Sequence, residues 1–187
     1  KGEKNMTLTN VANVDKLLPI YCVDTEEKKV ALTINCAWEN TDIDKILNSL
    51  KEYNVKVTFF VVGDFAKKYP ESVKAIYDAG HEIGNHTRNH YDMTLLANEE
   101  DCNKFVEEIM ITHKTIYEVT NVIPPMIFRF PKGDFSIRSM AMVHDLGFRT
   151  YFWSHAYNDY GIDVLKEEAY NNLVTHLHNG AIYLLHP

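Results

Sequence analysis

Two histidines four positions apart are the residues in this chain best suited to hold a metal ion. His86 and His90 follow a short strand-like run, and on a helix residues at this spacing lie on one face. Both imidazoles would then reach one divalent cation at about 2.0–2.1 Å. The spacing also fits two histidines on a solvated helix face, so on its own it leaves both interpretations open.

The elements that must position these histidines alternate between strand and helix. Apolar and β-branched runs predict strands at residues 29–34, 55–62, 81–84, 126–130, 148–153 and 181–186. Helical spacing of apolar residues predicts helices at residues 42–53, 71–79, 98–119 and 164–177. A further helix is predicted to begin after Ser136, a good N-cap, and to end at Gly147.

Repeated strand-helix alternation predicts an α/β fold whose parallel strands are joined by right-handed crossovers. The polar residues favour a (β/α) barrel over an open sheet, because each group of them follows a different strand, where a barrel gathers its active site. These residues are Asn35, Cys36, His86, Arg129, the stretch 153–159 and His186. No glycine-rich phosphate loop follows the first strand, which argues against a nucleotide-binding sheet.

Composition limits the possible partners. The chain has 187 residues with 45% hydrophobic content, enough for one domain, and its net charge of -7 argues against nucleic acid as a partner. Its three cysteines have no paired spacing, so we expect no disulfide framework. No apolar stretch reaches the roughly 20 residues of a membrane span, and the first residues lack a signal-peptide core. The oligomeric state stays open.

The chain is expected to consist of a lead-in at residues 1–28 and one domain at residues 29–187. A strand that runs straight to the C-terminus predicts that a further element follows it. An export signal or membrane anchor would lie outside this sequence.

Five ordered segments of the chain resemble the motifs of the polysaccharide deacetylase (NodB homology) family, carbohydrate esterase family 4. They are residues 30–40, 86–90, 128–133, 152–160 and 180–186. The chain looks most like the sporulation-type peptidoglycan deacetylases of Gram-positive spore formers. The resemblance implies a distorted, incomplete (β/α) barrel and a divalent metal, zinc first, with cobalt or manganese as alternatives. It also implies an exported, envelope-associated or spore-associated protein.

The resemblance assigns a role to each matching residue. His86 and His90 match the metal-binding histidines, Arg129 the arginine that orients the catalytic base, and His186 the general acid that Asp159 tunes. The residues implied to contact substrate are Trp38, Pro131, Trp153 and Tyr160. Lys132 either contacts a glycan carboxylate or is a solvated loop lysine.

The first motif departs from the family pattern. The family has an aspartate base and a metal-binding aspartate where this chain has Asn35 and Cys36. An amide cannot take a proton from water near neutral pH, and losing a positioned base costs on the order of 10²–10⁴ in rate. Cys36 either completes a Cys-His-His zinc site or is a buried apolar residue at a strand end.

The resemblance therefore implies metal-dependent de-N-acetylation of peptidoglycan or a related N-acetylated glycan, with His186 as both base and acid or with slow turnover. The alternative is a glycan-binding pseudo-deacetylase that has lost the chemistry. A redox-sensitive or zinc-storing site at Cys36 is a third hypothesis.

Overall fold

The six predicted strands and one short strand that was not predicted form one parallel sheet in the computed structural model, which describes residues 17–157, 159 and 165–187. Within these ranges the sheet has seven strands in the order β5-β4-β3-β2-β1-β7-β6. The strands are β1 (Ala31–Cys36), β2 (Thr58–Val61), β3 (Glu82–Asn85), β4 (Ile127–Phe128), β5 (Arg149–Thr150), β6 (His155–Ala156) and β7 (Ile182–Leu185). The helices are α2 (Ile43–Glu52), α3 (Gly63–Lys68), α4 (Pro70–Asp78), α5 (Met93–Leu96), α6 (Cys102–Thr120), the 3₁₀ turn η1 (Pro131–Gly133), α7 (Ile137–Asp145) and α8 (Lys166–Thr175).

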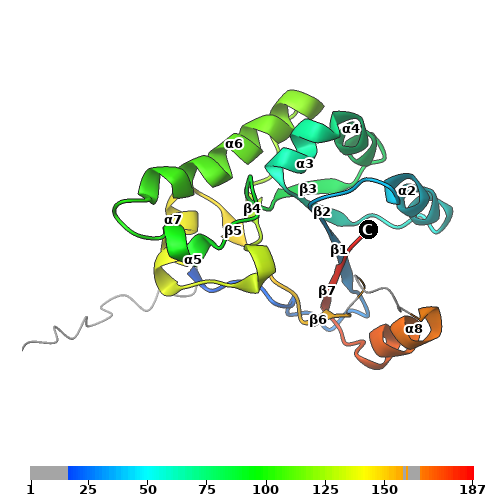
Figure 1. The fold of residues 1–187 in the computed structure, drawn as a ribbon. Helices are drawn as coiled ribbons and strands as arrows, with labels where there is room; N and C mark the ends of the chain where they lie inside the picture. Colours follow the sequence, from blue (N-terminus) through cyan, green and yellow to red (C-terminus); the bar gives the residue numbers. More distant parts are fainter. Residues whose placement is uncertain (1–16, 158, 160–164) are drawn as a thin grey trace, which may run out of the picture.

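The sheet curls into a half-barrel with helices around its outer side (Figure 1). Every strand pair is parallel: Thr33 of β1, for example, is in register with Thr58 of β2 on one side and with Leu184 of β7 on the other. The carboxyl ends of all these strands therefore meet at one end of the half-barrel. This architecture confirms the predicted incomplete (β/α) barrel.

The described part of the lead-in packs against both sides of the opening of the half-barrel. The Ile20 N–H donates to the Thr150 carbonyl at 3.0 Å, and the Ile20 carbonyl accepts from Phe152 at 2.8 Å. Farther along, the Val23 N–H donates to the Gly180 carbonyl at 2.8 Å. The proposed boundary at residue 28 stays a prediction.

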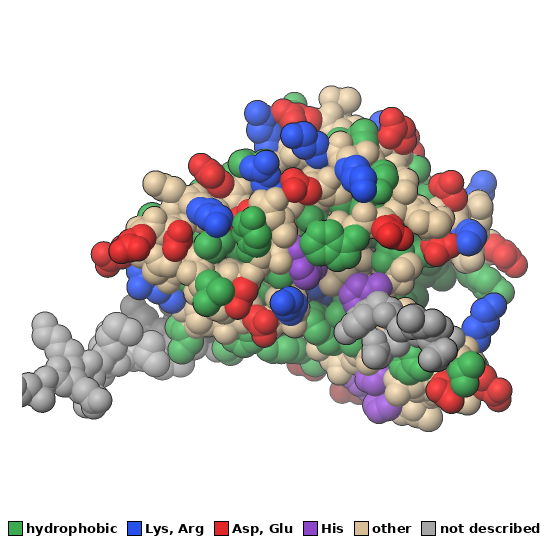
Figure 2. Space-filling model, viewed as in Figure 1, with side chains coloured by type: hydrophobic (Ala, Val, Ile, Leu, Met, Phe, Trp, Pro, Cys, Tyr) green, Lys and Arg blue, Asp and Glu red, His purple; other side chains and the backbone are tan. Residues whose placement is uncertain are grey.

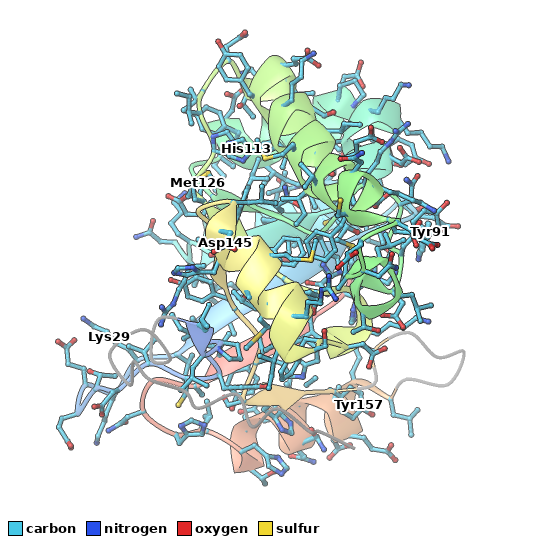
Figure 3. The ribbon with its side chains drawn as sticks, turned by 90° about the vertical axis from the view of Figure 1, so that its left-hand side faces the viewer. Lys29, Tyr91, His113, Met126, Asp145 and Tyr157 are labelled. Carbon is cyan, nitrogen blue, oxygen red and sulfur yellow. The ribbon has the colours of Figure 1, made fainter. Side chains whose placement is uncertain are left out.

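Two hydrophobic clusters hold the helices on the sheet. One joins β1, β2 and β3 to α2, α3 and α4, and it includes Phe59, Val61 and Ile76. The other lies beneath α6 and α7, which cover the sheet together in the side view (Figure 3), and includes Phe105 and Phe128. None of the described helices combines the length and apolar character that crossing a bilayer requires.

The structure differs from the sequence prediction mainly in short elements. Helices α3 and α5 and strand β6 were not predicted, because two to six residues are too few to display a helical or strand period. The strand predicted at residues 126–130 shortens to two residues, because the chain turns into η1 at Pro131. The Ser136 cap is confirmed: its hydroxyl accepts from the Ser139 N–H at 3.0 Å.

Candidate active site

A pocket of about 790 Å³ opens where the strands end. Histidine side chains are exposed near the centre of the face in Figure 2, next to hydrophobic side chains. The pocket is lined by Asn35, Ala37, Trp38, Glu39, His86, His90, Lys132, Trp153, Ala156, Tyr157, Leu184, His186 and Pro187. Its volume lies in the range typical of small-molecule sites, and the strand order brings together residues that are up to 152 positions apart.

His86 and His90 are neighbours, but not through a helix. Thr87 and His90 have φ angles of 66° and 59°, so the segment after β3 is a tight turn, and the helix on which the spacing argument was conditional is not formed. The turn is stabilised by the Thr87 hydroxyl, which accepts from the His90 N–H at 3.1 Å. The two imidazole centroids lie 4.9 Å apart, with ring planes at 77°.

His86 is held in the tautomer that a metal ligand needs. Its Nδ1 lies 2.8 Å from the Arg129 carbonyl, which can only accept, so Nδ1 carries the proton. Nε2 is buried and has no hydrogen-bond partner among the described residues. Burial, reinforced by His90, lowers the pKa of His86 to about 3, which keeps the ring neutral with an available lone pair.

The turn that carries His90 is anchored by Glu108 of α6, which the sequence analysis did not single out. The Glu108 carboxylate accepts from the backbone N–H groups of Arg88 and Asn89 at 3.0 and 2.8 Å. It also accepts from the Asn89 side-chain amide at 2.5 Å. Glu108 is buried on the same helix face as Phe105 and Ile109, and a carboxylate within an apolar stripe is the signal that could have identified it.

His186 and Asp159 meet at the pocket. One Asp159 oxygen accepts from the His186 backbone N–H at 2.6 Å, and the other lies 2.7 Å from Nδ1. The carboxylate can only accept here, so Nδ1 carries the proton and the ring is oriented by two hydrogen bonds. Burial and then the charge of Lys132 lower the pKa of His90, and His186 adds to this effect. His186 therefore lies close enough to the His86–His90 turn to influence it.

Arg129 is buried beneath the pocket without a carboxylate partner among the described residues. Its guanidinium donates to the Thr33 hydroxyl at 2.7 Å, to the Asn35 amide oxygen at 3.1 Å, and to the carbonyls of Tyr151 and Phe152. It also lies over the Phe60 ring at 4.0 Å. Burial lowers the pKa of Arg129 to about 9. Asn35 thus binds the arginine through a neutral oxygen, and its side chain contributes to the pocket.

Cys36 points away from the pocket. Thr33 and Asn35 face Arg129. Because side chains alternate along β1, Ile34 and Cys36 point to the opposite side, where both belong to the hydrophobic cluster between β1–β3 and helices α2–α4. Cys36 is fully buried, and burial raises the pKa of its thiol, which disfavours the thiolate that a metal would need. The geometry supports the buried apolar role for Cys36 and not the ligand role.

Two of the four residues expected to contact substrate, Trp38 and Trp153, line the pocket. Trp38 is 64% exposed on the pocket rim with its ring 5.6 Å from that of His90, and Trp153 lines the wall. Pro131 is buried in η1 and does not line the pocket, because the turn faces it inward. Tyr160 lies outside the described residues. Tyr157 and Leu184 also line the pocket, although the sequence analysis did not single them out.

The donor set fits a metal ion in part. The buried, unpartnered His86 Nε2 beside His90 is a pair of neutral imidazole ligands. Across the described ranges, no group of three or more His, Cys, Asp or Glu side chains is arranged to hold an ion. The two imidazoles would thus supply two of the ligands of a cation at this turn.

Comparison with known proteins identifies relatives of the chain. A family profile described as polysaccharide deacetylase matches residues 23–151. Peptidoglycan-N-acetylmuramic acid deacetylase PdaA of Bacillus subtilis is 35% identical over 92% of this chain, which spans 65% of that relative's length. The solved PdaA structure aligns with a TM-score of 0.85 over 92% of this chain and 73% of its own.

Two further relatives are a named deacetylase and a pseudoenzyme. A peptidoglycan-N-acetylglucosamine deacetylase of Bacillus cereus is 29% identical over 88% of this chain and 75% of its own length. The structure of a family 4 carbohydrate esterase pseudoenzyme from Bacillus anthracis aligns with a TM-score of 0.83 and 31% identity, over 91% of this chain and 58% of its own. A mutant of this pseudoenzyme is described as having restored enzymatic activity.

Proposed function

The chain belongs to the polysaccharide deacetylase family, and we propose that it removes acetyl groups from peptidoglycan or a related N-acetylated glycan, at a low rate. The observation that carries this proposal is the pair of His186 and Asp159 at the same pocket as the His86–His90 turn. The activities for which the relatives are named support a glycan with either N-acetylmuramic acid or N-acetylglucosamine. Action on such a glycan also implies a location at the cell envelope.

The proposed reaction is hydrolysis of the amide. Water adds to the acetyl carbon, the carbon–nitrogen bond breaks, and acetate and a free amine leave. His186, which is oriented by Asp159, delivers the proton to the departing nitrogen. Trp38 and Trp153 position the sugar ring at the rim and wall.

His86 and His90 would hold the divalent cation, for which zinc is proposed, with cobalt or manganese as alternatives. When bound, such an ion supplies Lewis-acid polarisation of the acetyl carbonyl and activates water. The chain's own contribution is to keep both rings neutral through burial and through the Arg129 carbonyl that fixes the His86 tautomer.

The missing base limits the rate. Asn35 stands where a carboxylate would accept the proton of the attacking water, and its amide cannot do so. His186 must then act as base before it acts as acid. The rate is expected to fall by about 10²–10⁴ relative to a site with a positioned base.

A second candidate function is glycan binding without catalysis. It is favoured by Asn35 at the base position, by Cys36 in the core, and by the similarity to a pseudoenzyme whose activity a mutation restores. The binding pocket and its aromatic side chains would be retained in such a protein.

Acetate release separates the two functions. Purified protein with Zn²⁺, Co²⁺ or Mn²⁺ is given chitooligosaccharide and spore-type glycan, beside His186→Ala and an exposed control, His178→Ala. Acetate from the wild type and His178→Ala, but not from His186→Ala, supports a slow enzyme. Acetate release by the Asn35→Asp variant alone supports the second function, glycan binding without catalysis. A Cys36→Asp variant would not serve as a test, because it would place a carboxylate in the hydrophobic core.

A further inference from the structure

Two histidines stack on each other outside the pocket, His155 of β6 and His176 at the C-terminal end of α8. Their ring centroids lie 4.0 Å apart and their planes meet at 11°. Asn172 of α8 holds both rings: its side-chain oxygen lies 2.7 Å from Nε2 of His155, and its backbone carbonyl lies 2.7 Å from Nδ1 of His176. These oxygens accept, so each neutral ring carries its proton on the nitrogen that faces Asn172. The other nitrogen of each ring keeps a lone pair that can take up a second proton.

Helix α8 has few other attachments to the rest of the molecule. Figure 1 shows it set apart from the other helices, beside β6 and β7. None of the residues of α8 is buried. The Tyr183 hydroxyl of β7 donates to the Leu173 carbonyl at 3.0 Å, and the Tyr183 ring lies 5.6 Å from that of His155. A weaker histidine stack should therefore loosen α8 more readily than it would a helix that packs into a hydrophobic core.

Strand β6 connects the histidine stack to the proposed proton donor. It is a two-residue strand at the edge of the sheet, where it pairs with β7. Tyr157 follows it and lines the pocket. Asp159, four positions after His155, accepts from the His186 backbone N–H at 2.6 Å and lies 2.7 Å from its Nδ1. The contact of α8 with β6 therefore supports the segment that brings Asp159 to His186.

The surroundings of the stack offer little to neutralise added positive charge. In the part of the chain that the structure describes, neither of the two histidines forms an ion pair. Burial raises the pKa of Tyr183, which keeps its hydroxyl neutral. The other titratable groups on the neighbouring segments are Glu26 in the lead-in, Glu168 on the same face of α8, and His178 after the helix, all at the surface. Glu168 lies two helical turns before His176, about 12 Å along the axis, where salt screens most of its effect.

Protonation would set two positive charges against each other. Histidine is the side chain that ordinarily changes charge between about pH 5 and pH 8. When both rings are charged, they face each other at the stacking distance of 4.0 Å. Because the pair is partly exposed, water weakens the repulsion, and the docking of α8 is expected to weaken by about fivefold.

We propose that the His155–His176 stack is a pH-sensitive latch, which holds α8 on β6 and Asp159 on His186 at neutral pH and loosens both contacts at acidic pH. Protonation of paired histidines is a known way to bias a contact between two elements. The proposal goes beyond the proposed function, because it concerns how the Asp159–His186 pair is held and not what the pocket binds.

Residue-level amide hydrogen exchange tests the latch in the metal-free protein, without glycan or turnover. Protection factors, which correct for the intrinsic effect of pH on exchange, are measured at about pH 7.5 and about pH 5. The two reporters are the amides of α8 and the His186 N–H, which donates directly to Asp159. The variants are His176→Phe, which keeps a ring for stacking but cannot be charged, and His176→Gln, which removes the ring. The matched control is His178→Phe, the same substitution two positions later at an exposed histidine.

The loss of protection between the two pH values is compared between proteins, since the other titrating groups are the same in each. In the wild type and His178→Phe, the loss at both reporters is expected to be about fivefold larger than in His176→Phe. His176→Gln is expected to have reduced α8 protection already at the higher pH. An equal loss in the wild type and His176→Phe overturns the latch, as does a loss in α8 that leaves the His186 N–H unchanged. Either result leaves the proposed function intact.

Discussion

Replacing Asn35 by aspartate is expected to stabilise the fold, because it places a carboxylate beside a buried cation. The hydrogen bonds of the Arg129 guanidinium go to two carbonyls, a hydroxyl and the Asn35 amide oxygen. Burial lowers the pKa of Arg129 from its ordinary 12.5 to about 9, which corresponds to a cost of about 5 kcal/mol for keeping the charge inside the fold. A carboxylate offsets part of that cost.

The size of the gain follows from the geometry. The Arg129 nitrogen lies 3.1 Å from the Asn35 oxygen, so the new carboxylate needs little movement to bind it. A hydrogen bond between charged groups contributes about 1.5–3 kcal/mol, from which the loss of the neutral bond and the desolvation of the carboxylate are subtracted. A net gain of about 1–2 kcal/mol raises the melting temperature of a domain this size by about 2–8 °C.

The pH dependence has a defined sign. Arginine lowers the pKa of the new carboxylate in the folded state below its unfolded value of about 3.9. The added stability is therefore fully present above about pH 4 and is lost as the pH falls through the lower folded pKa.

Thermal unfolding followed by circular dichroism, with metal removed by a chelator, measures the effect at pH 7 and below pH 4. The control is Asn48→Asp, which adds the same charge at an exposed position of α2. A melting temperature at pH 7 that falls, or that rises no more than in Asn48→Asp, would refute the conclusion that Arg129 has no carboxylate partner among the residues that the structure describes.

Three further predictions concern the His86–His90 turn and β1. Burial and then the charge of His90 lower the pKa of His86 to about 3 in the folded state. Between about pH 6.5 and pH 3 this histidine is protonated in the unfolded chain and neutral in the folded chain, so the free energy of unfolding decreases as the pH falls through this range. His86→Gln should lose less stability over that range in urea unfolding without metal, and an equal loss would contradict this. Glu108→Gln is expected to lower the free energy of unfolding by about 1–2 kcal/mol, because it weakens the hydrogen bonds to the turn. The control Glu107→Gln, at the exposed neighbouring position, should change the free energy of unfolding by less than about 0.5 kcal/mol. Equal denaturation midpoints for the two variants would argue against the anchoring role of Glu108. Cobalt bound to the wild type should show no thiolate charge-transfer band, and Cys36→Ala should keep the cobalt affinity; a band that disappears in this variant would restore Cys36 as a ligand.

Long elements and strand ends were predictable because their patterns are local. The apolar stripe of α6 spans five turns, and residues 55–62 have the composition of a buried strand around β2. Since parallel strands place their carboxyl ends together, the sequence also predicted that Asn35, His86 and His186 would come near one another. All three line the pocket.

Other features depended on packing between distant segments. Glu108 holds the turn at Arg88 and Asn89 from a helix 19 and 20 positions away, and no spacing rule connects them. The proximity of His86 and His90 results from left-handed backbone at Thr87 and His90, and the four-residue spacing alone does not reveal this turn.

The sequence by itself determined which chemical groups are present: two imidazoles and a histidine–aspartate pair at strand ends, with an amide and a thiol where the family resemblance implies two carboxylates. Only the tertiary structure decided that Asn35 faces a buried arginine while Cys36 faces the hydrophobic core. The reason is that residue types are local, whereas the side of β1 that meets Arg129 depends on how the sheet curls and on a contact across 94 positions of the chain.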